Sequence, residues 1–353
     1  MSERELCLLS LDGGGVRGLS SLLILKQLME RIDPKSPPKP CDHFDMMAGT
    51  STGGLIAIML GRLRMTVDDC IRSYSTLAEE VFQQKYHRVG WKSNLQGRFD
   101  SARLDLVCAT SQNSARCVRF TSYHSPRQLS DLTVVTKIWE AGRATSAAST
   151  FFDPIATRPH HKTFIDGATG ANNPPAAEYG PFNQSIKYLI SIETGVPLLE
   201  PFGNSLLEVA KALKNMAVES EATAEAFVQE HADLDDASRY FRLNVVSGLD
   251  RIGLEEYNQM ANIVAATRQY VQSHAVVKQM KACAQNLGER ESHFADATTH
   301  ATALSLRGPM VLERYGENSQ KLLDWLSSHD FTMAHMRLRT LRQEAGAGKT
   351  VLT

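Results

Sequence analysis

The apolar residues near the start of the chain are spaced so that strands and helices are predicted to alternate. Leu6–Leu11 is a short apolar run, which is typical of a buried parallel strand. Val16–Ile32 carries apolar residues at helical spacing and leads into a proline-rich loop at 34–40. An apolar run and a helix-competent run then lie on either side of Ser51. This strand–helix–strand–helix series predicts an α/β fold with a parallel sheet.

The remainder of the chain is expected to add less regular elements. Amphipathic spacing predicts a helix at 66–85, and 94–107 is predicted to form a loop and another helix. The other elements expected before residue 200 are strands at 115–120, 132–136, 163–165 and 188–192 and a helix rich in small residues at 138–150. Beyond about residue 204 the pattern predicts long helices at 206–234 and 252–287, with one strand between them at 240–246.

The turn between the second strand and its helix contains a Gly-x-Ser-x-Gly pattern, Gly49-Thr-Ser51-Thr-Gly53. In a strand–turn–helix setting this pattern is typical of a nucleophile elbow, in which small residues let the backbone turn sharply and expose the serine hydroxyl. The alternative is a tight turn in which Ser51 only caps the following helix.

A second glycine-rich turn, Gly13-Gly-Gly-Val-Arg17-Gly18, follows the first strand and opens the first helix. Its spacing matches a dinucleotide-binding loop, but an acid directly precedes the loop, and no acid about 20 residues further on stands at the end of a second strand. An oxyanion site fits better, because glycines let backbone N–H groups point into one cavity and a helix N-terminus adds positive potential. Arg17 is expected to hold this loop or an anionic head group, and a plain glycine-rich turn is the remaining alternative.

A serine nucleophile needs a base. A Ser-His-Asp triad would use a histidine after the last strands. Histidines available there include His231, His274, His293 and His300, and each of these lies in a helical or polar stretch without a motif. Asp166 is better placed, at the end of a predicted strand and directly before Gly167. A carboxylate there can accept the serine proton directly, as a two-residue dyad, although Asp before Gly is also common in simple turns.

Together, three motifs resemble the patatin-like phospholipase family in their order and spacing: Asp12-Gly-Gly-Gly-Val-Arg-Gly18, Gly49-Thr-Ser-Thr-Gly-Gly54 and Asp166-Gly-Ala168. The small-residue stretch at 141–152 is similar to the helix that precedes the catalytic aspartate in this family. The stretch at 191–195 is similar to a later strand end, although Glu193 stands where the family usually has glycine. The resemblance covers about residues 5–200, and the downstream helices are similar to those of fungal members.

This resemblance implies a three-layer α/β/α sandwich with a central, mostly parallel sheet. It also implies lipid acyl hydrolysis without metal or calcium. Carried over by position, Ser51 is the nucleophile, Asp166 followed by Gly167 and Ala168 is the base motif, and the amides of Gly13, Gly14 and Gly15, above all the last two, form the oxyanion site. Arg17 and Gly18 complete the loop, and Gly49 and Gly53 form the elbow.

The tail of the chain carries one more pattern. Gly346-Ala-Gly348-Lys-Thr350 resembles the end of a phosphate-binding loop, but Gln343 occupies the place of the first glycine and only three residues follow Thr350. The tail resembles the opening of an NTPase domain of the NACHT kind, to which fungal patatin-like domains are often fused. We therefore expect an acyl hydrolase domain at 5–200, a mainly helical extension at 201–335, and a tail at 336–353 that does not bind ATP but points to a fused NTPase domain in a longer protein.

Composition narrows the expected partners. A net charge of −1 on 353 residues argues against nucleic-acid binding through bulk charge. The six cysteines are scattered without a Cys-x-x-Cys pair, as in a reduced, cytosolic protein, and adjacent His160 and His161 lack a partner at metal-ligand spacing. No apolar run reaches the roughly 18–20 residues of a membrane span, and acids near the N-terminus argue against a signal peptide. We expect no cofactor and a cytoplasmic protein peripheral to membranes.

The favoured function is therefore a phospholipase A-type acyl hydrolase that acts on phospholipids or other glycerolipids at a membrane surface through Ser51 and Asp166. Two alternatives remain open. One is a regulated or non-catalytic effector module of an immune-type NTPase receptor. The other is a soluble carboxylesterase with a Ser-His-Asp triad. A dinucleotide-binding oxidoreductase is a more distant alternative.

Overall fold

A computed structural model describes residues 6–82, 104–112, 114, 116–121, 136–148, 154–157, 162–169, 186–195 and 220–288. The described strands form one sheet in the order β5-β6-β3-β2-β1-β7-β8, and β4 also pairs with β3. Their bounds are β1 Leu6–Leu11, β2 Met46–Thr50, β3 Leu104–Ser111, β4 Cys117–Thr121, β5 Ile155–Thr157, β6 Lys162–Asp166, β7 Ile186–Ile192 and β8 Tyr240–Leu243. Pairing is parallel from β3 through β2, β1 and β7 to β8, and antiparallel where β4, β5 and β6 join. This confirms the expected α/β fold with a mostly parallel sheet.

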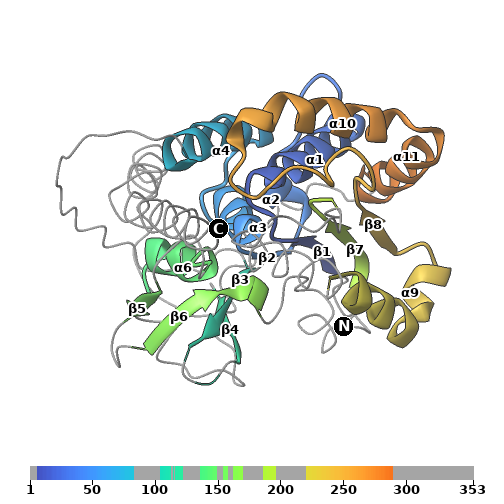
Figure 1. Ribbon diagram of the computed structural model, residues 1–353. Coiled ribbons are helices and arrows are strands. Elements are labelled where there is room, and N and C mark those ends of the chain that lie inside the picture. Colours follow the sequence, from blue (N-terminus) through green and yellow to red (C-terminus); the bar gives the residue numbers. More distant parts are fainter. Residues whose placement is uncertain are drawn as a thin grey trace, which may run out of the picture.

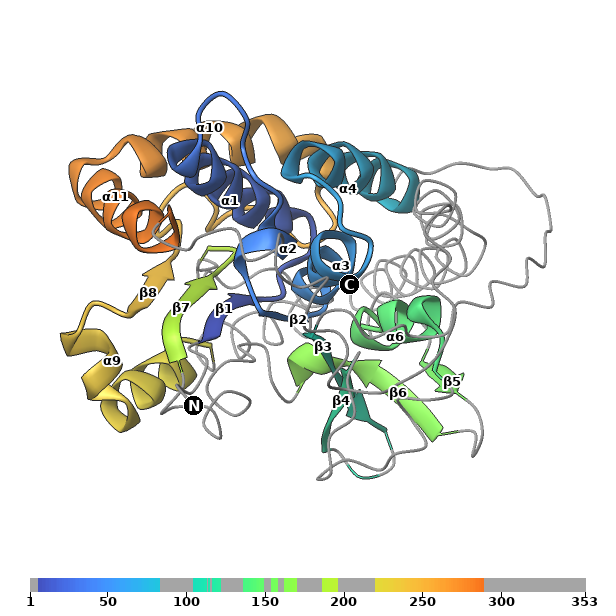
Figure 2. The same ribbon diagram turned by 180° about the vertical axis from the view of Figure 1, so that it is seen from behind.

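Helices cover both faces of the sheet (Figures 1 and 2). The helices are α1 Gly18–Ile32, α2 Pro40–His43, α3 Thr52–Ala57, α4 Val67–Phe82, α6 Ile138–Thr145, α9 Ala232–Asp236, α10 Met260–Gln272 and α11 His274–Gly288, with a further helical stretch at 220–230. In both views α1, α4, α10 and α11 lie on one side of the sheet and α9 lies on the other. Short 3-10 turns precede α1 at Gly15–Arg17, follow β6 at Gly167–Thr169 and precede α10 at Tyr257–Gln259, and a π-helical turn follows α3 at Ile58–Arg62.

The central strand β1 shows why both faces need a covering layer. Leu9 and Leu11 belong to a core shared with α1, α4, α10 and α11, whereas Leu8 belongs to a second core that includes Phe227 and Leu234. Side chains alternate between the two faces of a strand, so a strand that is apolar throughout must be buried on both faces. The segment after residue 220 therefore contributes to both layers, and its strand β8 extends the sheet beyond β7.

Several elements differ from the sequence-based expectation. The helix expected to reach Val107 is wrong for its last residues, because β3 begins at Leu104 and pairs along β2. The long helix expected at 252–287 is two helices, because Ser273 is extended (φ −64°, ψ 144°) between α10 and α11. The helix expected at 206–234 is interrupted at His231, whose φ of −125° and ψ of 44° are not helical. Amphipathic spacing alone does not mark these breaks.

Other boundaries also shift. The helix expected at 138–150 ends at Thr145, and β5 was not expected. Strands at 115–120, 163–165, 188–192 and 240–246 are confirmed within a few residues by β4, β6, β7 and β8. The expected elements at 83–103 and 132–135 and the tail at 336–353 lie outside the described residues.

The pairing of β3 brings two strand ends together. β2 pairs with the first part of β3, so that Thr50 lies opposite Cys108. β6 pairs with the last part of β3, so that Asp166 lies opposite Ala109. On the other side of β2, Leu11 of β1 lies opposite Gly49. The loops that follow β1, β2 and β6 therefore begin at neighbouring positions of one sheet edge.

Two further properties concern the cysteines and the length of the helices. No disulfide joins any of the six cysteines. None of the helices within the described ranges is long and apolar enough to cross a membrane.

Candidate active site

Ser51 occupies the sharp turn between β2 and α3. Its backbone has φ 53° and ψ −124°, a conformation that non-glycine residues adopt rarely and only where the surroundings enforce it. The flanking glycines explain how the chain makes this turn. A Cβ on Gly49 would overlap the carbonyl of Gly53, and a Cβ on Gly53 would overlap the carbonyl of Leu11. The turn thus packs against itself and against β1, with the geometry of a nucleophile elbow.

The hydroxyl of Ser51 donates a hydrogen bond to Asp166 Oδ2 at 2.6 Å. Ser51 is the residue before the first turn of α3, yet its side chain makes no capping hydrogen bond to that helix. The structure therefore does not show the helix cap that was the alternative interpretation of this serine. Oγ is instead aligned with a carboxylate that can accept its proton.

Asp166 ends β6 and is only 1% exposed. Its second oxygen, Oδ1, accepts a hydrogen bond from the Ala168 amide at 2.8 Å, and its own amide donates to Ala147 O at 2.9 Å. Burial raises the pKa of Asp166 to about 7, and the hydrogen bonds from Ser51 and Ala168 oppose that rise in part. A carboxyl group whose pKa lies near neutrality is suited to act as a general base. Gly167 packs against Cys108 O, which holds this turn close to β3.

Thr145, at the end of α6, holds the turn at Ser51 in place. This role of Thr145 was not expected from the sequence. Its hydroxyl donates to Cys108 O at 2.6 Å and accepts from the Ser51 amide at 2.9 Å. Thr145 is fully buried. One side chain therefore ties the strained turn to β3. The run of small residues in this helix indicated a close approach, but nothing in the pattern singled out this threonine.

The glycine-rich loop lies beside the elbow, between the end of β1 and the start of α1. Gly15 has φ 56°, and a Cβ there would overlap Leu254 O, so a side chain is excluded both by conformation and by space. The carbonyl of Gly15 accepts hydrogen bonds from Tyr74 Oη and from Thr52 Oγ1, the latter at 3.2 Å. Within the described part of the chain, no acceptor takes the amides of Gly14 or Gly15.

Arg17 points into the protein, where it stabilises the loop. It is 4% exposed, and it donates from Nε to Gly14 O and from Nη1 to Gly195 O, both at 3.5 Å. Burial lowers its pKa to about 10, so the guanidinium stays charged at neutral pH. Of the two roles expected for Arg17, these contacts fit loop support. Gly18 begins α1 in close contact with Thr52.

The histidines do not join this site in the described part of the chain. None of them there hydrogen-bonds with Ser51 or Asp166. His231 is buried against the ring of Phe227, with 4.6 Å between ring centroids, next to the strand β8 at the opposite end of the sheet. His274 begins α11, and the other two candidates lie outside the described residues.

The described ranges contain no group of three or more His, Cys, Asp or Glu side chains that could hold a metal ion. The adjacent His160 and His161 lie outside those ranges.

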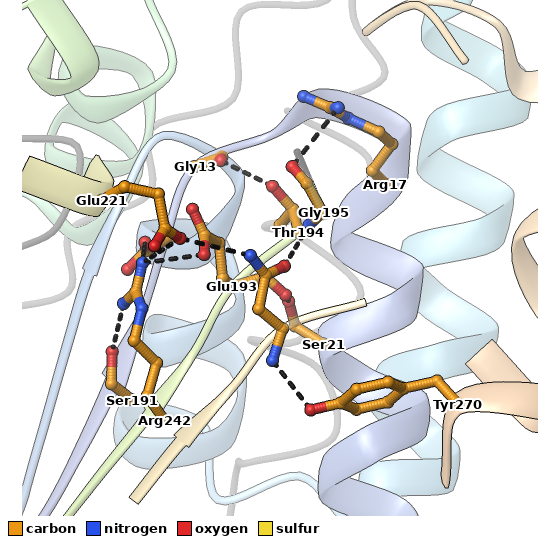
Figure 3. A network of polar contacts seen from close by, with 12 residues as sticks. Gly13, Arg17, Ser21, Ser191, Glu193, Thr194, Gly195, Glu221, Arg242 and Tyr270 are labelled. Atoms are coloured by element: carbon orange, nitrogen blue, oxygen red, sulfur yellow. Dashed lines mark hydrogen bonds and ion pairs between the residues drawn. The ribbon is translucent and has the colours of Figure 1, made fainter. Parts of the chain in front are cut away.

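A second polar cluster lies behind the glycine loop and was not expected from the sequence, apart from the unusual Glu193. Arg242 of β8 lies between the carboxylates of Asp12, Glu193 and Glu221 (Figure 3). Burial raises the pKa of Asp12 to about 7, with Arg242 opposing the rise. Burial also raises the pKa of Glu193 well above its usual value. In the sequence, the one indication of this cluster was Glu193, an acid where the resembling family usually has glycine. Its partner, Arg242, lies 49 residues further along the chain.

Comparison with known proteins places this geometry in context. Residues 9–178 match the family model described as patatin-like phospholipase. Human calcium-independent phospholipase A2-gamma is 30% identical over 208 residues, which are 49% of this chain and 25% of that protein. Phospholipase A I of Arabidopsis thaliana is 33% identical over 135 residues, covering 37% of this chain and 9% of that protein.

Bacterial proteins are similar as well. A cGAMP-activated phospholipase of Escherichia coli (strain TW11681) is 27% identical over 190 residues, covering 47% of this chain and 52% of that protein. The solved structure of VipD from Legionella pneumophila is similar with a TM-score of 0.39 and 14% identity, covering 76% of this chain and 67% of that chain. The chain spans from 9% to 52% of the length of the three curated relatives named here. The stretch that is similar to patatin-like phospholipases, residues 9–178, includes both Ser51 and Asp166.

Proposed function

We propose that this chain is a lipid acyl hydrolase that cleaves fatty acyl esters of phospholipids or other glycerolipids. The observation that carries the proposal is the 2.6 Å hydrogen bond from Ser51 Oγ to Asp166 Oδ2 at a strained strand–helix turn. The lipid class is supported by the similar proteins, which are named as phospholipases. Such substrates are assembled in bilayers, so we propose a cytoplasmic enzyme that contacts membranes peripherally.

The proposed chemistry follows from the geometry in two steps. In the first, Asp166 takes the proton of Ser51 while Oγ attacks the ester carbonyl, and the resulting oxyanion is bound by the amides of Gly14 and Gly15. The tetrahedral intermediate then expels the alcohol, which takes the proton from Asp166, and the acyl group stays on Ser51. In the second step Asp166 takes a proton from water, the hydroxide attacks the acyl-enzyme, and the free fatty acid leaves as Ser51 regains its proton.

The experiment that tests this proposal measures fatty acid release from liposomes of mixed phospholipids. The chain with Ser51→Ala or with Asp166→Asn is expected to lose nearly all release. The matched controls are Ser247→Ala and Asp236→Asn, which carry the same substitutions at exposed positions away from the site. Release by Ser51→Ala at the original rate would overturn the assignment. Profiling the lysolipids and fatty acids that form would identify the head group and the position cleaved.

The triad alternative is not favoured, and a separate experiment distinguishes it. A Ser-His-Asp esterase would lose activity when its histidine is replaced by alanine. We expect His231→Ala, His274→Ala, His293→Ala and His300→Ala to hydrolyse a soluble ester at close to the original rate. A loss of two or more orders of magnitude in one of them, with the fold intact, would favour the triad.

The sequence of the tail supports a proposal about regulation. Gly346–Thr350 resembles the opening of an NTPase domain. One similar protein is named for activation by cGAMP, so an enzyme of this class under the control of a signal has a precedent. We propose that a fused NTPase domain, of the kind found with fungal patatin-like domains, controls the site in a longer protein. A full-length transcript in which this stretch does not continue into an NTPase domain would contradict it.

A further inference from the structure

The segment 193–195, directly after β7, lies against the glycine loop (Figure 3). Three hydrogen bonds join the two: Thr194 Oγ1 to Gly13 O at 2.9 Å, Arg17 Nη1 to Gly195 O at 3.5 Å, and Ser21 Oγ to Glu193 O at 3.1 Å. Each residue of the segment thus contacts the loop or the helix that the loop opens. The end of a neighbouring strand thereby supports the loop.

The bond from Thr194 has a consequence for the amide of the next residue. The carbonyl of Gly13 and the N–H of Gly14 belong to the same planar peptide unit and point in opposite directions. By holding the Gly13 carbonyl, Thr194 fixes the direction of the Gly14 N–H. The side chain of Thr194 also fills the space that a Cβ on Gly14 would need, so the loop cannot settle closer to β7.

Arg17 acts in the same way one peptide further along. The carbonyl of Gly14 accepts from Arg17 Nε at 3.5 Å and from the Arg17 amide at 3.2 Å. That carbonyl shares its peptide plane with the N–H of Gly15. The two amides that the proposed chemistry assigns to the oxyanion are therefore each oriented through the carbonyl that precedes them.

Thr194 is in turn held from β8. The amide of Glu193 donates to Leu243 O at 3.0 Å, and the amide of Gly195 donates to Asn244 Oδ1 at 3.0 Å. The carboxylate of Glu193, which is 2% exposed, accepts from Arg242 Nη2 at 2.7 Å. Both neighbours of Thr194 are therefore fixed by main-chain and side-chain contacts to β8 and to Asn244, the residue that follows it.

Arg242 also reaches the start of the glycine loop. Its Nη2 lies 3.9 Å from Asp12 Oδ2 and 3.1 Å from Glu221 Oε1, and its Nη1 donates to Ser191 Oγ at 3.2 Å. Asp12 is fully buried, and neither of its oxygens accepts a hydrogen bond from the described residues. The positive charge of the Arg242 guanidinium offsets the cost of burying two carboxylates, that of Asp12 after β1 and that of Glu193 after β7.

We propose that Thr194 is a positioning residue that orients the Gly14 amide toward the oxyanion, and that the ion pair of Glu193 with Arg242 holds Thr194 in place. The inference deepens the proposed function and rests on it. The support thus joins the segment after β7 to Arg242 of β8 through a buried side-chain contact.

The test uses p-nitrophenyl butyrate as a soluble ester and a fluorophosphonate probe that labels an activated serine. We expect Thr194→Val to lower kcat on the order of 10-fold with little change in KM, which is less than the ~100-fold or more that follows removal of an oxyanion donor. The rate of labelling at Ser51 should fall in parallel, and Thr194→Ser should restore both. The matched control is Thr267→Val, which removes a buried threonine hydroxyl from α10 and should leave kcat unchanged.

Thermal unfolding of both valine variants separates positioning from stability. A kcat of Thr194→Val equal to that of the original chain would overturn the inference, and so would an equal loss in Thr267→Val. If Thr194→Val does not fold, Arg242→Lys is measured instead. This variant keeps the positive charge but loses the two-pronged guanidinium that bonds to both Ser191 and Glu193. An unchanged kcat of Arg242→Lys would also overturn the inference. If the original chain is not labelled at Ser51, it is the proposed function that fails.

Discussion

Ser51 and Asp166 are 115 residues apart in the sequence, and their side chains meet at 2.6 Å because Ser51 directly follows β2 and Asp166 ends β6, two strands that both pair with β3. Thr50 lies opposite Cys108 and Asp166 lies opposite Ala109, the next residue. The geometry of the pair is therefore set by hydrogen bonding in a sheet, which tolerates little variation, and the following predictions depend on it.

The activity should rise with pH through about 7. Asp166 can accept the Ser51 proton only when it is ionised, and burial raises its pKa to about 7. Well below that pH the rate should fall about tenfold per pH unit, and above about pH 8 it should level off. Initial rates with a soluble ester between pH 5.5 and 9 check this without changes in lipid ionisation. A flat profile across that range would argue against Asp166 as the base.

Replacing Asp166 by asparagine should stabilise the protein at high pH while it removes the activity. A carboxyl whose folded pKa is raised contributes stability that is fully present below its unfolded value of 3.8 and is lost as pH rises through about 7. The difference amounts to at most roughly 4 kcal/mol at pH 8. Asp166→Asn should therefore unfold at a higher temperature than the original chain at pH 8, and the advantage should shrink toward pH 4.

The same experiment has a control. Asp236→Asn, at an exposed position, should show no such pH-dependent difference from the original chain. An Asp166→Asn protein that is less stable than the original chain at pH 8, and equally so at pH 5, would mean that the buried carboxylate carries no charge penalty.

Thr145→Val should loosen the elbow. The substitution keeps the shape but removes the hydroxyl that bonds to the Ser51 amide and to Cys108 O. We expect a loss of about 1–3 kcal/mol in the free energy of unfolding, because two main-chain groups each lose a hydrogen bond. The labelling rate of Ser51 should fall about tenfold or more, because its Oγ is no longer fixed. Thr145→Ser keeps the hydroxyl and serves as the control; equal labelling of both variants would contradict the role given to Thr145.

Replacing a glycine by alanine should destabilise the protein where the glycine is in close contact with backbone atoms, and should stabilise it where the glycine occupies an ordinary helix position. Gly53→Ala would force a Cβ into the carbonyl of Leu11, so we expect little folded protein. Gly142→Ala, inside α6, places its Cβ 3.4 Å from Leu55 Cδ2, and it should stabilise the helix by about 0.5–1 kcal/mol. Thermal unfolding and soluble yield measure both. A well-folded Gly53→Ala protein would show that the elbow can open away from β1.

The parts of this site that could be predicted from the sequence are those formed by residues that lie close together in the chain. Ser51 between two glycines, the glycine run after β1 and Asp166 before Gly167 each form a local pattern, and parallel strands then place the loops at one sheet edge. The sequence alone could not distinguish a Ser51 that caps α3 from a Ser51 that bonds to Asp166, because both arrangements need the same residues in the same order. The hydrogen bond to Asp166 distinguishes them.

The supporting residues could not be predicted, for a physical reason. Thr145 contacts a residue 94 positions away, and Arg242 contacts one 49 positions away. Such contacts leave no periodicity in the chain, because each depends on where two separate elements dock. The start of β3 was assigned to a helix for the same reason: what makes it a strand is pairing with β2, which the local residues do not specify.

The pairing of β3 with both β2 and β6 has a consequence for how this sequence can change over generations. Insertions and deletions in the connections between the strands leave Ser51 and Asp166 in place, because the strand pairing that sets their positions does not depend on the length of those connections. A single residue gained or lost between Cys108 and Ala109 would instead displace one side chain relative to the other by a full strand position, about 3.3 Å. Length variation among descendants of this chain should therefore collect in the loops and be absent from that one peptide bond.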